Sequence, residues 1–236
     1  MLKLASNFVK STHFRKYSTS LSKMSNEEKT GVKLDDIISV LEKFAPKKLS
    51  ESWDNTGLLV EPYTPRNIKK ILLTNDLTED VALEAKRNNC EMVISYHPPI
   101  FAPLKTVVQR LLHINNEFDL SKAIEKVKSL TGLKHVRLAI GKGRALTDNV
   151  KNVALCAGSG SSVLKKVAKV DLFLTGEMLH HDILDATQRG ISVILTNHSD
   201  SERGFLCGFS SHLQNELNNK VLVLVSEYDK DPLSTV

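Results

Sequence analysis

The chain has 236 residues, of which 41% are hydrophobic and 25% are charged, a composition typical of a globular protein with one large domain or two small ones. No apolar run approaches the ~18 residues of a membrane-spanning helix, so we expect no membrane partner. The formal net charge is +5, and residues 1–24 alone hold five basic residues and no acidic one. The remainder is formally neutral, so we expect no direct contact with nucleic acid.

Residues 1–24 are basic, rich in serine and threonine, and free of acidic residues, as is typical of a mitochondrial transit peptide. Arg15 lies two residues before Tyr17, a spacing that suits processing after Tyr17. The alternative is a disordered tail, with Met24 as a second start. We therefore expect the protein in the mitochondrial matrix, in the cytoplasm, or in both.

Three widely spaced cysteines, Cys90, Cys156 and Cys207, show neither zinc-finger spacing nor a disulfide framework. Their apolar or helical surroundings predict buried free thiols in a reducing compartment.

Hydrophobic periodicity and turn residues predict that helices and strands alternate along the rest of the chain. The first helix is marked by apolar residues at helical spacing and ends before Pro46; the second begins after Thr78, a suitable N-cap. The expected helices cover residues 34–44, 77–89, 120–130, 162–169, 178–190 and 200–219. The expected strands cover residues 58–60, 69–76, 91–97, 134–143, 150–162, 170–177, 191–198 and 220–228. This order is typical of an α/β protein with a largely parallel sheet.

Four of these strands end in a residue that can bind a metal or handle protons: Asp76, His97, Glu177 and His198. In open α/β sheets, functional sites lie outside the carboxyl ends of the strands. His97 is followed by two prolines, which end its strand and leave the imidazole at such a position. The alternative interpretation is that His97 has no functional role and simply lies where the strand ends.

The segment "NHSDSERG" places His198 and Glu202 four residues apart at the start of a helix, where both side chains share one face. A nitrogen and an oxygen donor together suit zinc, manganese, iron or nickel better than calcium. The alternative is that Glu202 caps the helix and His198 is a polar strand end.

Two further segments carry candidate groups. In "GEMLHHD", Glu177 and His181 are again four residues apart, and they suit proton transfer or contact with substrate; the alternative is a solvated helix start. The small residues of "CAGSGSS" form either a cradle for an anion or a tight connection between a strand and a helix.

Several longer motifs resemble the NIF-three-like family, whose members are also labelled type 2 homologues of GTP cyclohydrolase I. The motifs are "ESWDNTGLLVEP", "LLTNDLTEDV", "ISYHPPIF", "LAIGKGR", "VALCAGSGSSVL", "LTGEMLHHDILDA" and "NHSDSERGFL". The resemblance implies an α/β fold with mostly parallel sheets flanked by helices, a site at the strand carboxyl ends, and a homo-oligomer, namely a hexamer. It divides the family domain into an N-terminal part, residues 25–106, and a C-terminal part, residues 107–236.

The resemblance also implies a two-metal site. His97 matches one histidine of the family's first ligand pair, and Tyr96 stands in the place of the other. His198 and Glu202 match the last ligand element. The middle element, a His-Thr-x-x-Asp segment, is absent, and "HINNEFD" does not replace it because its spacing is wrong.

The expected cofactor is therefore one or two divalent transition-metal ions, zinc, manganese, iron or nickel, bound by His97, His198 and Glu202. Glu177 and His181 are the expected catalytic residues of a metal-dependent hydrolase that acts on a nucleotide or phosphoester. Two alternatives remain open. One is a non-enzymatic interaction protein with a transcription-related protein partner, and the other is an inactive truncated form.

Overall fold

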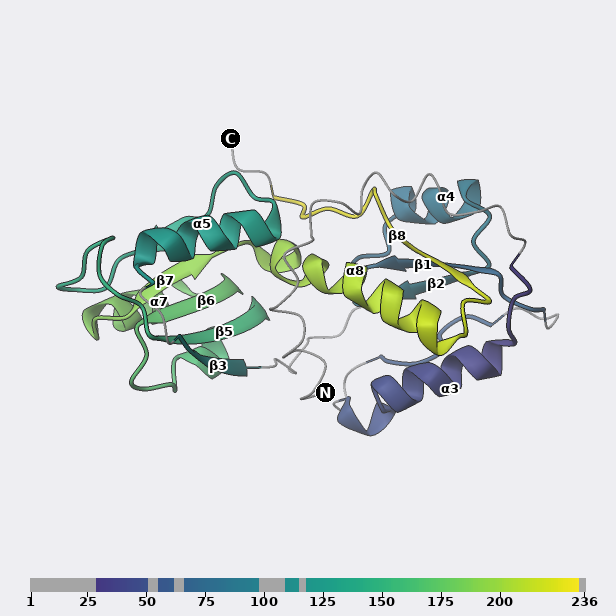
Figure 1. Ribbon diagram of the computed structural model, residues 1–236, viewed down its shortest axis with the longest axis horizontal. Helices are drawn as coiled ribbons and strands as arrows, with labels where there is room; N and C mark the ends of the chain where they lie inside the picture. Colours follow the sequence, from purple (N-terminus) through teal and green to yellow (C-terminus); the bar gives the residue numbers. More distant parts are fainter. Residues whose placement is uncertain (1–28, 51–54, 62–65, 98–108, 115–117, 234–236) are drawn as a thin grey trace.

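The computed structural model of the protein describes residues 29–50, 55–61, 66–97, 109–114 and 118–233 (Figure 1). The expected transit peptide, residues 1–24, lies outside these ranges. Two sheets lie side by side in Figure 1, and helix α8 (His198–Glu216) begins between them and runs along the right-hand sheet. No helix in the described ranges has both the length and the apolar character that a bilayer crossing requires.

The first sheet has three parallel strands in the order β2 (Met92–Ser95), β1 (Lys70–Thr74) and β8 (Leu222–Val225). Because side chains alternate along a strand, those of β1 pack into two hydrophobic cores, one on each face of the sheet. Ile71 and Leu73 pack with α3 (Leu34–Phe44) and α8 on one face, and Leu72 packs with α4 (Glu79–Arg87) on the other. A short 3-10 turn, Lys47–Leu49, follows α3.

The second sheet has five strands. Their order is β3 (Gln109–His113), β5 (Asn152–Ser159), β6 (Leu172–Glu177), β7 (Ser192–Leu195) and β4 (Arg137–Ala139). The three central strands are parallel, and the two outer strands run antiparallel to their neighbours.

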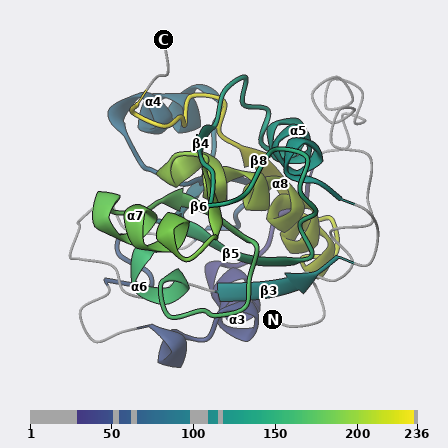
Figure 2. The same cartoon turned by 90° about the vertical axis from the view of Figure 1, so that its left-hand side faces the viewer.

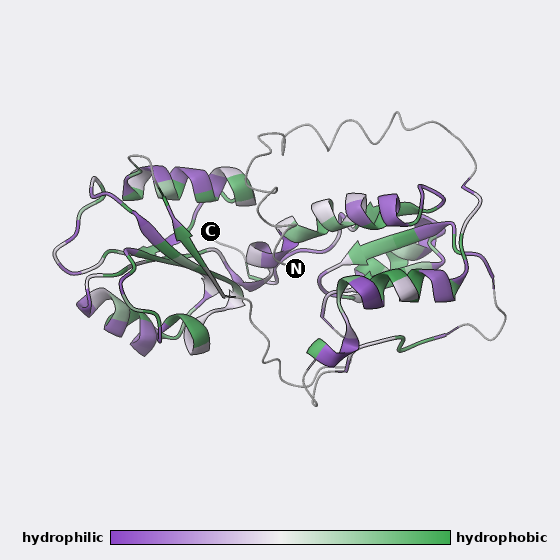
Figure 3. Ribbon diagram, turned by 60° about the horizontal axis from the view of Figure 1, so that its bottom comes forward, coloured by the Kyte–Doolittle hydropathy of each residue, from purple (hydrophilic) through white to green (hydrophobic). Residues whose placement is uncertain are grey.

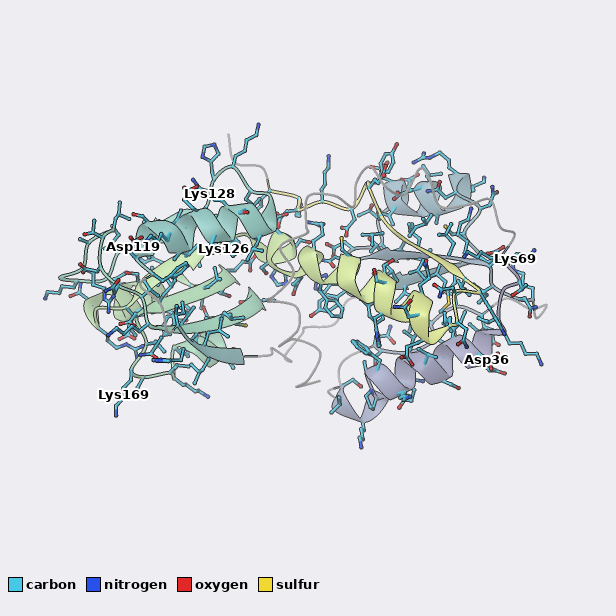
Figure 4. All side chains as sticks on the ribbon, viewed as in Figure 1. Asp36, Lys69, Asp119, Lys126, Lys128 and Lys169 are labelled. Carbon is cyan, nitrogen blue, oxygen red and sulfur yellow. The ribbon has the colours of Figure 1, made fainter. Side chains whose placement is uncertain are left out.

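Helices cover both faces of this second sheet. Figure 2 shows α6 (Ser161–Leu164) and α7 (His180–Gln188) on one side and α5 (Leu120–Thr131) on the other. The strands are largely hydrophobic, whereas the helices carry polar residues outward (Figure 3). In α5, for example, Ala123 and Val127 are buried while Lys126 is exposed (Figure 4).

Helix α8 joins the two sheets, since it contacts β1 and β8 of the first and β5 and β6 of the second. Its buried residues Leu206, Phe209 and Leu213 belong to the core of the first sheet. Its first turn lies at the carboxyl ends of the parallel strands of both sheets, which is where the sequence places the functional site. The α/β class, the mostly parallel sheets and the flanking helices are as predicted.

Four expectations about local structure were wrong. The helix expected over residues 162–169 is only the four-residue helix α6, and residues 165–169 are not helical. Residues 58–60 form no strand in the described chain, because this apolar run is not buried; Val60 is 86% exposed. Strand β3 was not predicted, because polar residues interrupt its apolar pattern; it is an edge strand whose Leu111 is 64% exposed. Cys207 is exposed on α8 rather than buried, whereas Cys156 is buried and Cys90 is half-buried.

Candidate metal centre

His97 is held where strands β1 and β2 end together. Beyond β2, the His97 N–H donates to the Asn75 carbonyl at 2.9 Å, so that the chain still follows β1. The Ser95 hydroxyl donates to the His97 carbonyl at 2.6 Å and fixes the bend. The residue is only 8% exposed, and backbone contacts fix the chain on either side of its side chain.

His198 and Glu202 come from the first turn of α8. Asn197, just before the helix, has φ 67° and ψ 158°, a backbone region that non-glycine residues rarely adopt. This conformation turns the chain sharply from the end of β7 into the helix. The Ser201 hydroxyl donates to the His198 carbonyl at 2.6 Å. His198 and Glu202 then lie one helical turn apart on the same face, as their spacing predicts.

The structure brings His97, His198 and Glu202 together. One donor atom from each residue lies within 4.8 Å of the others. His97 Nε2 is 3.4 Å from Glu202 Oε2, and His198 Nε2 is 3.6 Å from Glu202 Oε1. The two imidazole ring centres are 5.6 Å apart. These three residues, called the triad below, offer two nitrogen donors and a carboxylate to one point.

Two buried atoms of the triad, His97 Nε2 and Glu202 Oε2, have no hydrogen-bond partner among the described residues. They lie 3.4 Å apart without the alignment of a hydrogen bond. A buried polar atom without a partner costs about 1–3 kcal/mol, so such atoms are uncommon unless something else satisfies them. A divalent transition-metal ion between the three donors would satisfy both atoms, so the residues present fit such an ion.

Each histidine of the triad has a carboxylate at Nδ1, the ring nitrogen that faces away from Glu202. His97 Nδ1 donates to Asp76 Oδ1 at 2.9 Å, and the other oxygen of Asp76 accepts from the Ser199 hydroxyl at 2.9 Å. His198 Nδ1 is 3.3 Å from Glu177 Oε2. Three of the four predicted strand ends thus contribute to one site, and Glu177 borders it through His198.

The electrostatics of the site follow from these contacts. The bond to Asp76 raises the pKa of His97 above its usual value, although burial acts in the opposite direction. The same bond lowers the pKa of Asp76. Burial raises the pKa of Glu202, even though both neighbouring histidines favour its ionised form.

Gly158, near the end of β5, closes the site from the second sheet and was not predicted to do so. A Cβ atom at this position would lie 2.6 Å from Glu202 Oε1 and 3.2 Å from His198 Nε2, and its φ of +65° also favours glycine. The Gly158 N–H donates to the Ser201 hydroxyl at 2.7 Å. A glycine inside a predicted strand, as in "CAGSGSS", was the available signal for a close approach.

Other candidates from the sequence lie elsewhere. His181 is exposed on α7, with its ring edge-on to His180 at 5.4 Å, and the described structure does not bring it into the triad. His113 Nδ1 bonds to Asn152 Oδ1 at 2.8 Å, and Asp119 caps α5. Neither residue belongs to the triad in the described structure. Tyr96 packs edge-on against the ring of His97, 5.0 Å between centres.

The fold and the triad define an α/β protein with a cluster that could hold a metal ion at the carboxyl ends of its strands. The sequence matches the family described as Duf34/NIF3 (NGG1p interacting factor 3) over residues 32–113 and 106–232, and the chain belongs to this family.

Curated relatives support this assignment. NIF3-like protein 1 of Drosophila melanogaster is 38% identical over 267 residues, covering 88% of this chain and 90% of that protein. NGG1-interacting factor 3 of Saccharomyces cerevisiae is 30% identical over 283 residues, covering 87% and 98%. NIF3-like protein 1 of Homo sapiens is 29% identical, with 89% and 94% covered.

Solved structures share the fold. The Bacillus cereus protein related to NIF3 gives a TM-score of 0.74 at 16% identity and covers 87% of this chain and 99% of that one. The Staphylococcus aureus protein SA1388 gives 0.72 at 20% identity, with 87% and 100% covered. At these identities the similarity concerns the fold alone.

The comparisons also bear on the absent middle element. The alignment to the human relative spans 357 positions, more than the 236 residues of this chain, so that relative has segments without a counterpart here. The two parts of the family match meet at residues 106–113. This is the stretch at which the expected ligand segment is missing from the sequence.

Proposed function

We propose that this protein binds one divalent transition-metal ion through His97, His198 and Glu202 and acts as a metal-dependent hydrolase on a nucleotide or phosphoester. The observation that carries the proposal is the pair of buried donor atoms, His97 Nε2 and Glu202 Oε2, which lack a hydrogen-bond partner in the described chain and face each other at 3.4 Å. Nitrogen and oxygen donors in this ratio favour zinc, manganese, iron or nickel.

An ion in this position would supply Lewis acidity toward a phosphoester oxygen and would favour ionisation of a nearby water molecule. Three protein donors leave a position open for a substrate. Glu177 is a partly exposed acid beside the triad: its Oε2 is 3.3 Å from His198 Nδ1, and its side chain is 46% exposed. We assign Glu177 the role of proton acceptor for an attacking water. His181 is exposed on α7 and outside the triad, and the catalytic role proposed for it is contact with a bound substrate.

The direct test is hydrolysis of a panel of nucleotides and phosphomonoesters by the full chain loaded with zinc or manganese. The proposal predicts turnover that is lost in His198→Ala and reduced in Glu177→Gln, with metal still bound in the latter. His135→Ala is a matched control, since His135 is exposed and lies outside the triad. Absence of turnover across the panel by folded, metal-loaded protein would contradict the hydrolase part and leave a metal-binding protein.

A second candidate function is interaction with a transcription-related protein. It is favoured by the name of the yeast relative, NGG1-interacting factor 3. The absence of formal net charge in residues 25–236 fits a protein partner better than nucleic acid. Affinity purification of the tagged full chain tests it: recovery of a transcriptional adaptor supports the candidate, and recovery of this chain alone contradicts it.

We further propose that the protein forms a homo-oligomer, a hexamer, and is located in the mitochondrial matrix, in the cytoplasm, or in both. The first rests on the family resemblance and the second on the composition of residues 1–24. Light scattering of the purified chain tests the oligomer. Imaging of the chain with and without residues 1–24 tests the location.

A further inference from the structure

The geometry points to Asp76 as a positioning residue, which holds His97 in the tautomer with its proton on Nδ1 and thereby presents the Nε2 lone pair to the cation. The inference rests on the metal centre proposed above. Asp76 would touch neither the ion nor the substrate. Its effect would pass through His97 alone.

The tautomer follows from the contacts of the ring. An ionised carboxylate can only accept a hydrogen bond, so the 2.9 Å contact between Asp76 Oδ1 and His97 Nδ1 requires the proton to be on Nδ1. A neutral imidazole carries only one proton, and Nε2 is then left with a free lone pair. Nε2 is also the buried atom that faces Glu202 Oε2 and has no hydrogen-bond partner in the described residues. The ring is therefore oriented for ligation from its far side.

Asp76 is itself fixed by the helix that carries the other two ligands. Its Oδ2 accepts from the hydroxyl of Ser199, in the first turn of α8, at 2.9 Å. Ser199 is held in turn by its carbonyl, which accepts from Asn75 Nδ2 at 3.2 Å, and by its N–H, which donates to Asp231 Oδ2 at 3.2 Å. One carboxylate thus links the end of β1, the ring of His97 and the start of α8. Displacing it would misplace His97 relative to His198 and Glu202.

A purely structural role for Asp76 predicts something different. As a bond between a sheet and a helix, it would add stability to the fold without controlling the proton on His97. Its loss would then lower the melting temperature and leave the tautomer and the metal affinity of the folded protein unchanged. The two roles are separated by measuring the tautomer in the metal-free chain and the affinity at a temperature at which every variant is folded.

The experiment uses full-length chain labelled with ¹⁵N in histidine and long-range ¹H–¹⁵N correlation at alkaline pH, where the ring is neutral. The His97 signals are assigned from their absence in His97→Gln. We expect the Nδ1–H tautomer in the wild-type protein, a mixture of both tautomers in Asp76→Ala, and partial rescue in Asp76→Asn, whose carbonyl oxygen can still accept. Ser199→Ala serves as the second variant if Asp76→Ala does not fold.

Binding of Co²⁺, followed by its visible absorption, provides the second readout. We expect Asp76→Ala to weaken Co²⁺ binding about 10–100-fold, the usual effect of removing a group that orients a metal ligand. Asp80→Asn is the matched control, since Asp80 is an exposed carboxylate on the neighbouring helix α4, and it should bind Co²⁺ as the wild type does.

The Nε2–H tautomer in the wild-type chain would overturn the inference, and so would unchanged Co²⁺ affinity in folded Asp76→Ala. If the wild-type chain shows the Nδ1–H tautomer and Asp76→Ala loses it, but neither chain binds Co²⁺, then the role of Asp76 in holding the tautomer is supported and only the proposed metal centre fails.

Discussion

His97 Nε2 lies 3.4 Å from Glu202 Oε2, although the two residues reach this point from different parts of the fold. His97 follows β2, an edge strand of the first sheet, and Glu202 belongs to the first turn of α8. That turn is in close contact with Gly158 of the second sheet. The site therefore exists only where both sheets and α8 meet. Metal affinity should consequently depend on the relative position of the two sheets.

Removing either histidine of the triad should abolish tight binding of a transition metal. We expect His97→Ala and His198→Ala to weaken zinc binding by more than the ~10–100-fold effect of groups that only orient ligands. Competition with a chromogenic chelator measures this affinity. His135→Ala should leave it unchanged, and a wild-type affinity in His97→Ala would show that this ring is not a ligand.

Gly158 offers a test of close packing at the site. Gly158→Ala should cost about 1 kcal/mol of stability because of its positive φ, and it should also weaken zinc binding, since the new methyl group would meet Glu202 and His198. Gly132→Ala is a matched control: its φ is +76°, and no atom of the described chain lies within 4 Å of a Cβ placed there. Thermal melts and zinc titration measure both effects.

The two glycine variants should thus share the cost of a positive φ, but Gly158→Ala should lose further stability through its contact with Glu202 and should differ in metal affinity. Equal metal affinity in Gly158→Ala and Gly132→Ala would contradict the placement of Gly158 against the ligands.

The stability of the metal-free protein should depend on pH through three groups, of which Asp76 acts in the direction opposite to His97 and Glu202. The raised pKa of His97 stabilises the fold fully below the ordinary value of 6.5, and this contribution is lost as the pH rises through the raised value. The lowered pKa of Asp76 stabilises the fold above the ordinary value of 3.8, and this contribution is lost as the pH falls through the lowered value. The raised pKa of Glu202 acts in the same direction as that of His97.

Zinc should reverse the trend near neutral pH, because His97 and Glu202 must be deprotonated to bind it. Melting temperatures recorded across the pH range, with and without zinc, measure both effects. The stabilisation by zinc should grow as the pH rises, and the decline of the metal-free protein should be smaller in His97→Gln. A zinc effect that is independent of pH would contradict these assignments.

Removing the N-terminal cap of α5, which is outside the triad, should change the stability of the protein but not its metal affinity. The Asp119 carboxylate accepts from the Lys122 N–H at 2.7 Å and caps α5. Asp119→Ala should therefore lower the free energy of unfolding by about 1 kcal/mol, as measured with urea, and leave zinc affinity unchanged. Glu125→Ala on the same helix should change neither, since the ion pair of Glu125 with Lys128 is at the surface. Weaker zinc binding by folded Asp119→Ala would mean that α5 shapes the site.

Much of the fold was readable from sequence because its elements have clear local signals. The apolar spacing of α3, the Thr78 cap of α4 and the apolar runs of β1, β6 and β7 each predict one element. Strand β3 lacks such a signal, since an edge strand with exposed side chains is stabilised by its neighbour β5 rather than by its own pattern. Residues 58–60 show the reverse: their apolar pattern predicts a strand, but they pair with no neighbouring strand in the described structure.

The triad was predicted in part by position and in part by resemblance. The spacing of His198 and Glu202 and the prolines after His97 place these residues at strand ends, but no local pattern shows that they meet. Asp76 was recognised as a strand end without its bond to His97, because that bond depends on the register of β1 and β2. The approach of Gly158 depends on how the second sheet packs against α8, which the sequence does not encode locally.

The proposed metal centre is tested most directly by the amount of transition metal bound per chain, determined by elemental mass spectrometry on folded protein. We predict one ion per chain, lost in His97→Ala and retained in His135→Ala. A well-folded chain that binds no transition metal, or binds it equally after His97→Ala, would contradict the proposed metal centre.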